Sequence, residues 1–159
     1  ELDSLVYSHR PGRYSFSELK SEIKLYPEKA ERIKQRIGIF FETINILFER
    51  TGKRILIDPD IDVITVYRDK DLLLFSQLSS GEKQLLIILF KVFLMDEKPS
   101  ILMMDEPENS LHIEWQQQLI DVIRKLNPNC QLIISTHSPS IFGEGWGDKL
   151  FFLEDLHID

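Results

Sequence analysis

Apolar residues along this chain recur with two different periods. Between Glu28 and Arg50 they are spaced three and four residues apart, which is the period of an amphipathic helix. Pro27 fits the start of this helix, and Gly52 lies just past its end. A shorter helix is predicted between Phe16 and Tyr26, with a serine as its cap.

Short β-like runs follow this helical region. They cover residues 54–58, 63–67 and 72–75, and polar residues with one proline separate them. Short runs of this kind, with turn residues between them, are typical of antiparallel strands. The sequence therefore predicts an antiparallel β meander after the helices.

Beyond Gly81 the pattern changes to an alternation of helix and strand. Residues 82–95 are apolar almost all round, which predicts a buried helix. The later predicted elements are strands at 101–104 and 131–134, an amphipathic helix from Leu111 to Leu126, and a last strand from Lys149 to Leu153. Strands without polar alternation that are linked by a helical crossover predict a parallel sheet with helices covering both faces. We therefore predict an α/β fold in three parts, a helical segment (1–53), the β meander (54–75) and the parallel-sheet part (76–159).

Composition narrows the class of protein. The 159 residues are 43% hydrophobic, which suffices for the core of about one domain. The longest apolar run, Leu85 to Phe90, is interrupted by Lys91 and closes at Met95, so it is shorter than a membrane span of about 18 residues. The net charge of −7, without a run of basic residues, gives the whole chain no electrostatic footprint for nucleic-acid phosphates. With a single cysteine and no signal segment a cytoplasmic location is predicted, and the polar start without a methionine predicts that the chain is a fragment.

Two adjacent carboxylates, Asp105 and Glu106, end the first strand of the predicted parallel sheet. The carboxyl edge of such a sheet faces the crevice where ligands bind in open α/β folds. A carboxylate there can hold Mg²⁺ directly or through water, which suits Asp105. Glu106 can accept a proton from a water that attacks a γ-phosphate. The alternative is a pair of solvated acids that begins a loop, and the four apolar residues before the pair argue against it.

Further candidate residues lie at the start of the predicted buried helix and after the second strand. Ser79 or Ser80 can cap the helix, while Gly81 allows another backbone to approach closely. A helix start with free N–H groups can bind an anion, although capping serines alone are weak evidence for a phosphate site. His137 follows the strand at 131–134 and can donate to a phosphate oxygen or position a water, although a histidine in this place is more often structural.

Taken together and in this order, these segments resemble the carboxyl-terminal half of an ABC-type ATPase head. The matching segments are Leu-Ser-Ser-Gly-Glu at 78–82 for the signature motif written LSGGQ, 101–106 for the Walker B strand, 108–112 for the D-loop, and His137 for the switch histidine. The residues at 80–84 and 105–112 resemble those of the soluble AAA-family ATP-binding proteins. These proteins are related to SMC-like heads, overcoming-lysogenization-defect nucleases, and Septu and retron phage-defence ATPases. The Walker A phosphate loop, G-x-x-x-x-G-K-[ST], does not occur in the sequence. We therefore expect the Walker A lobe to be missing from this chain.

The resemblance implies a P-loop NTPase-like fold, ATP and Mg²⁺ as cofactors, and two heads that enclose ATP between them. The residues that it would place against a partner head's nucleotide are Ser79, Ser80, Gly81, Glu82, Asn109 and Ser110. It would assign Asp105 to the metal, and Glu106 and His137 to catalysis, at the ATP held by this head's own Walker A lobe.

Competing functions follow from these expectations. The first is ATP hydrolysis in a dimer that drives an attached DNA-related or phage-defence activity. The alternative is a non-catalytic dimerisation or regulatory half of a larger complex. The intact Asp105–Glu106 pair favours the first, because a non-catalytic half would have little need of the glutamate. A nuclease of the lysogenization-defect type would require a metal-binding Toprim domain downstream, and none is present in this sequence. The expected partners are a second head, the Walker A lobe, a nuclease or other effector and, in the complete protein, DNA, but no membrane.

Overall fold

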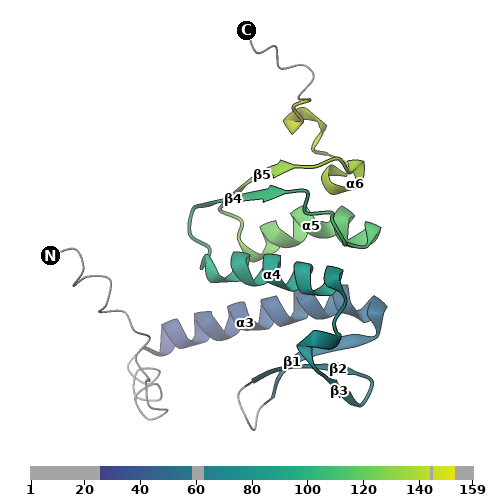
Figure 1. Cartoon of the computed structure of the whole chain (residues 1–159). Helices are drawn as coiled ribbons and strands as arrows, with labels where there is room; N and C mark the ends of the chain where they lie inside the picture. Colours follow the sequence, from purple (N-terminus) through teal and green to yellow (C-terminus); the bar gives the residue numbers. More distant parts are fainter. Residues whose placement is uncertain (1–25, 59–62, 144, 153–159) are drawn as a thin grey trace, which may run out of the picture. The chain divides into compact units, whose positions relative to one another are not determined.

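The computed structural model describes residues 26–58, 63–143 and 145–152 (Figure 1). The chain divides into two compact units, residues 1–38 and 39–159. The described part of the first unit, 26–38, is mainly the beginning of helix α3 (Pro27–Phe48). The predicted helix between Phe16 and Tyr26 lies, except for its last residue, outside the described residues.

Helix α3 confirms the helix predicted between Glu28 and Arg50. Pro27 is its first residue, where a missing N–H costs no hydrogen bond. The short 3-10 helix η1 (Glu49–Thr51) follows, and Gly52 ends it with a φ of 65°, a left-handed conformation that glycine adopts without strain.

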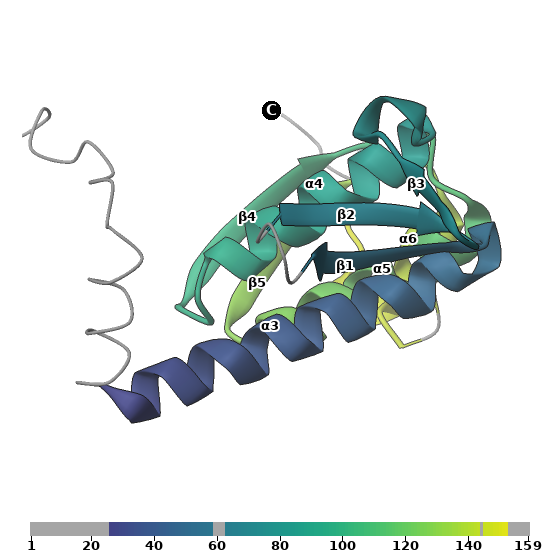
Figure 2. The ribbon, with the colours of Figure 1, turned by 90° about the horizontal axis from the view of Figure 1, so that it is seen from below.

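The predicted meander is confirmed by β1 (Lys53–Asp58), β2 (Val63–Arg68) and β3 (Asp71–Leu73), which pair antiparallel in that order (Figure 2). The register places Ile55 opposite Val66 and Val66 opposite Leu73, so that apolar side chains share one face. Asn45 of α3 ties the meander to the helix, because its amide donates to the carbonyl of Ile55 at 2.9 Å and accepts from the N–H of Ile55 at 2.7 Å. The edge of β1 is therefore anchored to the second unit's part of α3.

Helix α4 (Ser80–Leu94) follows the 3-10 helix η2 (Phe75–Gln77) and forms the centre of the core. The ring of Phe40 packs against Phe90 at 4.7 Å and Phe93 at 4.6 Å between centroids. The predicted burial of this helix holds for most of its circumference, but Ile87 and Leu94 are exposed. No helix in the described ranges has the length and apolarity needed to cross a bilayer.

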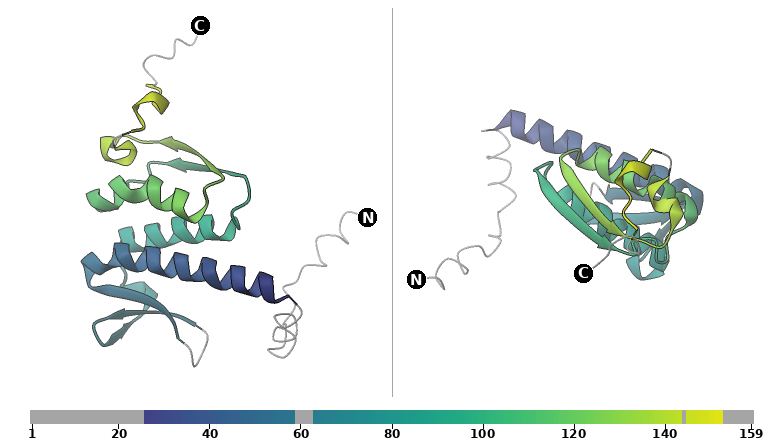
Figure 3. Two further views of the ribbon diagram at one scale, coloured as in Figure 1. Left: turned by 180° about the vertical axis from the view of Figure 1, so that it is seen from behind. Right: turned by 90° about the horizontal axis from the view of Figure 1, so that it is seen from above.

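The predicted parallel sheet is formed by β4 (Ser100–Asp105) and β5 (Cys130–Ser135), which run in register from Ser100 opposite Cys130 to Asp105 opposite Ser135. Helix α5 (Ile113–Leu126) connects them, and α6 (Pro139–Phe142) follows β5. Seen from the front and from behind, α5 and then α4 lie on the same side of the two strands (Figures 1 and 3). Leu102, Met104, Leu132 and Ile134 pack on the core from that side.

Two expectations about this part of the chain are wrong. Among the described residues, helices cover one face of β4–β5, and Ile101, Met103 and Ile133 are exposed on the other. Burial therefore alternates along both strands although the sequence is apolar on both faces. The strand predicted from Lys149 to Leu153 is also not present in the described residues, where the 3-10 helix η3 (Gly147–Lys149) precedes an unpaired extended segment. A strand requires a neighbouring strand for its hydrogen bonds, and this segment pairs with none.

Candidate functional site

The carboxyl end of β4 brings Asp105 and Glu106 to the end of the parallel sheet. Asp105 is exposed on the same face as Met103, the face that the helices leave open. The N–H of Glu106 donates to the carbonyl of Ser135 at 2.8 Å, which extends the pairing with β5 by one residue. Glu106 has a φ of 43°, a left-handed conformation that a residue with a side chain adopts at a cost. Because such conformations cluster at functional sites, this one supports a role for Glu106.

Both carboxylate oxygens of Glu106 have a neighbour. Nε2 of His137 lies 3.3 Å from Oε1, and Nδ2 of Asn109 donates to Oε2 at 3.0 Å. The His137 side chain is 89% exposed and that of Glu106 39% exposed, so both can reach a ligand. The structure thus brings together the two residues predicted to be catalytic, and it adds Asn109 to them.

The start of α4 carries the predicted signature residues. Ser79 is the N-cap, whose Oγ accepts from the N–H of Glu82 at 3.2 Å, while Oε2 of Glu82 accepts from the N–H of Ser79 at 2.8 Å. These reciprocal bonds form a capping box and fix the first turn. Ser79 and Ser80 are exposed, and the N–H groups of Ser80 and Gly81 in this turn have no partner within the helix. The exposed Ser79 and Ser80 therefore offer hydroxyl and amide donors that could bind an anion, whereas Gly81 is buried.

Glu82 lies behind this surface rather than on it. Its side chain is 1% exposed, and its Oε1 accepts from Nζ of the buried Lys53 at 2.5 Å. Burial acts to raise the pKa of Glu82, but hydrogen bonds from Lys53, the Ser79 backbone and Thr51, together with the charge of Lys53, hold it below its ordinary value. Glu82 is therefore an ionised carboxylate whose charge is paired within the protein. In this arrangement it has no exposed oxygen for the nucleotide contact that the sequence predicts.

Gly81 makes the predicted close backbone approach, and its neighbour is the D-loop segment of the same chain. A Cβ on Gly81 would overlap the carbonyl oxygen of Ser110 and lie 3.2 Å from its carbonyl carbon. Ser110 itself has a φ of 67°, and it is exposed, as is Asn109. The start of α4 and the segment after β4 thus touch through backbone atoms. Two groups of predicted site residues are joined at this point.

Glu108 bonds the backbone of the candidate residue His137, although the sequence alone did not single it out. Its Oε1 accepts hydrogen bonds from Oγ1 of Thr136, the N–H of His137 and the N–H of Ser138. Burial acts to raise the pKa of Glu108, but these bonds, from Thr136 first, hold it below the ordinary value of a glutamate. Only the position of Glu108 within the D-loop motif could have drawn attention to it.

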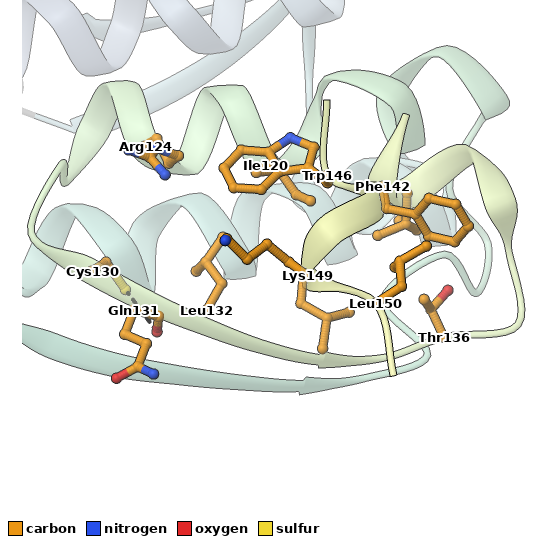
Figure 4. A pocket seen from close by; sticks show the side chains of 12 residues that line it. Ile120, Arg124, Cys130, Gln131, Leu132, Thr136, Phe142, Trp146, Lys149 and Leu150 are labelled. Carbon is orange, nitrogen blue, oxygen red and sulfur yellow. Dashed lines mark hydrogen bonds between the residues drawn. The ribbon is translucent and has the colours of Figure 1, made fainter. Parts of the chain in front are cut away.

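A cavity of about 350 Å³ lies beside β5 and α5, and its remaining wall is formed by Ile141, Phe142, Trp146, Lys149 and Leu150 (Figure 4). Arg124 stands over the ring of Trp146 at 5.3 Å from its centroid, and Leu132 and Leu150 contribute apolar walls. Of the polar residues at the end of β5, Thr136 lines this cavity. Asp105, Glu106 and His137 do not, so the cavity is separate from the candidate site.

Comparison with known proteins identifies the family. The family described as "AAA domain, putative AbiEii toxin, Type IV TA system" matches residues 3–143. The chain belongs to this family. Membership in this AAA family confirms the resemblance to soluble AAA-family ATPases and, with the parallel β4–β5 pair and its crossover helix, the predicted P-loop NTPase-like fold class.

A curated relative of this AAA chain is the "Retron Vc95 probable ATPase" of Vibrio cholerae serotype O1 biovar El Tor, which is 28% identical over 109 residues. The aligned part is 62% of this chain and 21% of that protein, so the chain spans about a fifth of the length of this relative.

Among solved structures, a similar chain is the Smc head bound to the C-terminal winged-helix domain of ScpA, at 19% identity, with a TM-score of 0.47, covering 65% of this chain and 36% of that one. Another is a chain from a study of ATP-driven dimerisation and DNA-stimulated activation of SMC ATPases, at 18% identity and a TM-score of 0.44, covering 72% of this chain and 76% of that one. At these scores the likeness is partial, and the family assignment rests on the family match.

Proposed function

We propose that this chain is the C-terminal part of an ABC-type ATPase head and hydrolyses ATP when it is combined with a Walker A lobe, an assembly called the complete head below. The observation that carries the proposal is the contact between Glu106 and His137 at the carboxyl end of β4 and β5. A carboxylate 3.3 Å from an imidazole, both exposed, is a suitable pair for handling a water and its proton.

The residues present suit Mg²⁺. No group of three or more His, Cys, Asp or Glu side chains among the described residues is arranged to hold a metal ion. Mg²⁺ does not require such a group, because it keeps several waters and is commonly held by one or two carboxylates together with substrate phosphates. Asp105 is exposed at the sheet edge and would be that carboxylate. When bound, Mg²⁺ would neutralise charge on the β- and γ-phosphate oxygens.

In the proposed reaction Glu106 is the general base. Its carboxylate takes a proton from water as the water oxygen bonds to the γ-phosphorus and the bond from phosphorus to the ADP oxygen breaks. His137 lies against the same carboxylate and would orient the water or donate to a γ-phosphate oxygen. Asn109 holds the other oxygen of Glu106, which limits rotation of the base.

At the start of α4, Ser79, Ser80 and Gly81 would contact the γ-phosphate of an ATP bound by a second head, with Asn109 and Ser110 nearby. We assign Glu82 a supporting role in place of direct contact. A free carboxylate at this helix end would repel phosphate, but the Lys53 ammonium pairs with Glu82 and offsets its charge. The Glu82 charge would then oppose phosphate binding at the start of α4 much less.

The open face of β4–β5 supports the expectation of a further lobe. Ile101, Met103 and Ile133 are 61%, 73% and 46% exposed, and parallel strands are normally covered on both faces. We propose that the Walker A lobe packs here, beside Asp105 on the same face. A homodimeric second head, a nuclease or other effector, DNA as a target, a phage-defence role and a cytoplasmic location stay predictions.

The alternative function is a non-catalytic dimerisation or regulatory half. It would need the signature surface but not an ordered base, so the strained Glu106 with two neighbours favours hydrolysis.

Complementation between two inactive complete heads tests the proposal. Ser80→Arg places a long cation where the signature would approach a partner's γ-phosphate, and His137→Ala removes a residue of the head's own site. ATP turnover should fail in Ser80→Arg alone and be reduced in His137→Ala alone, because every composite site of each variant contains the lesion. In a mixture, one site of each heterodimer combines an intact signature with an intact His137, so activity should rise above that of either variant. Absence of recovery at every mixing ratio would contradict the two-head arrangement.

A further inference from the structure

The exposed imidazole of His137 is not held in place by packing. Its side chain is 89% exposed, and its described contact is with Glu106. The imidazole can stay beside Glu106 only if the backbone of residues 136–138 is fixed. The bonds that fix this loop therefore also determine where the imidazole lies in the site.

The carboxylate of Glu108 bonds this loop at three successive residues. Its Oε1 accepts from Oγ1 of Thr136 at 2.6 Å, from the N–H of His137 at 2.8 Å and from the N–H of Ser138 at 3.1 Å. A carboxylate is suited to this arrangement, since it accepts several hydrogen bonds and donates none when ionised. Bonds to an ionised acceptor are also stronger than those between neutral groups.

A second set of bonds closes the loop from the other side. Oγ of Ser138 donates to Oε1 of Gln116 at 2.7 Å, and Nε2 of Gln116 donates to the carbonyl of Leu111 at 2.9 Å. The segment after β4 and the loop after β5 are thus joined twice by side chains. Glu108 is the only one of these side chains that bonds the N–H of His137 itself among the described residues.

We propose that Glu108 is a positioning residue that holds the backbone of His137 so that its imidazole stays against Glu106. This inference rests on the proposed function for its effect on turnover, but the positioning can be measured without ATP. Glu108 lies two residues after the base in the same segment. A shift of that segment would therefore move Glu106 and the anchor of His137 together.

Amide hydrogen exchange in the 159-residue chain tests the positioning. Glu108→Ala should accelerate exchange at the N–H group of His137, because its acceptor is removed. The N–H group of Ser138 should be accelerated less, since it also donates to Oγ1 of Thr136 at 3.0 Å. Glu108→Gln keeps one acceptor oxygen and should give a smaller acceleration, which also provides a readout if the alanine variant fails to fold. Glu114→Gln, in a glutamate of α5 that pairs with Arg50, is the matched control and should leave both groups unchanged. Unchanged exchange in both Glu108 variants would overturn the proposal.

Steady-state kinetics of the complete head tests the consequence for turnover. Glu108→Ala should lower kcat by about tenfold to a hundredfold, the cost of a misplaced catalytic group, with little change in KM for ATP. Glu108→Gln should retain more activity. In the His137→Ala background, Glu108→Ala should cause little further loss, since it acts through His137. Fully additive losses would overturn the positioning role, whereas a wild-type head without turnover would refute the proposed function and leave the exchange result to stand alone.

Discussion

His137 and Glu106 meet at the ends of neighbouring parallel strands, with Nε2 of the imidazole 3.3 Å from Oε1 of the carboxylate. The register of β4 and β5 explains the meeting, because Asp105 lies opposite Ser135 and each candidate residue follows shortly after. The left-handed φ of Glu106 then turns its side chain at the strand end. The parallel register therefore brings the backbones of these two candidate residues close together.

Removing one partner from the buried Lys53–Glu82 ion pair should destabilise the fold strongly. Lys53→Met would leave the Glu82 carboxylate buried without its cation, and loss of one partner from a buried pair costs about 3–5 kcal/mol. Adding Glu82→Gln to Lys53→Met should recover part of the loss, because no charge then stays buried. The measurement is the free energy of unfolding from urea denaturation. Lys149→Met, which breaks the exposed pair with Asp148, is the control and should have little effect. Equal losses in the single and double variants would contradict this account.

Gly81 should tolerate no side chain. Gly81→Ala would drive a methyl group into the carbonyl of Ser110, and overpacking of this kind costs about 1–3 kcal/mol. Gly38→Ala is a matched control in an exposed part of α3, where a Cβ meets nothing within 4 Å. That substitution should stabilise the chain by about 0.5–1 kcal/mol because alanine loses less entropy in a helix. Thermal unfolding of the two variants should shift in opposite directions, and equal shifts would show that Gly81 is not tightly packed.

Stability should fall in acid partly through Glu108. Its pKa in the folded chain is below the ordinary value of 4.5. Because the pKa is lower in the folded chain than in the unfolded one, ionised Glu108 stabilises the fold at pH values above its ordinary pKa. This contribution is lost as the pH falls toward the pKa of the folded chain. Urea denaturation between about pH 7 and about pH 3 should show a smaller acid loss in Glu108→Gln than in the wild type. Glu42→Gln, in an exposed glutamate of α3, should keep the wild-type profile. A Glu108→Gln profile identical to the wild-type one would refute the assignment.

Much of the fold could be predicted because hydrophobic period reports which face of an element is buried. It predicted α3, the meander, α4, α5 and both parallel strands. It could not report which segment covers a given face. The sequence therefore predicted helices on both faces of the parallel strands, whereas Met103 and Ile133 are exposed on one of them. For the same reason the apolar residues near Phe151 suggested a strand, although no strand among the described residues pairs with them.

The sequence could predict those candidate residues that are identified by their position in a motif. Adjacency in the sequence identified the Asp105–Glu106 pair, and the position after a strand identified His137. The partners of Glu82 and Glu108 were not predictable, because Lys53 and Thr136 are distant in the sequence and meet these carboxylates only through the tertiary fold. The sequence predicted a nucleotide contact for Glu82, because its position in the signature motif does not reveal that its side chain is buried.

The most direct test of the central claim is phosphate release by the complete head and by its Glu106→Gln variant, measured alongside binding of Mg-ATP. The amide keeps the shape and the hydrogen bond to Asn109 but cannot take the proton, so turnover should fall by about 10²–10⁴-fold while ATP binding is retained. The 159-residue chain alone, which contains no Walker A loop, is the control and should show neither micromolar ATP binding nor turnover. Unchanged turnover in Glu106→Gln would contradict the claim that this chain supplies the base for ATP hydrolysis.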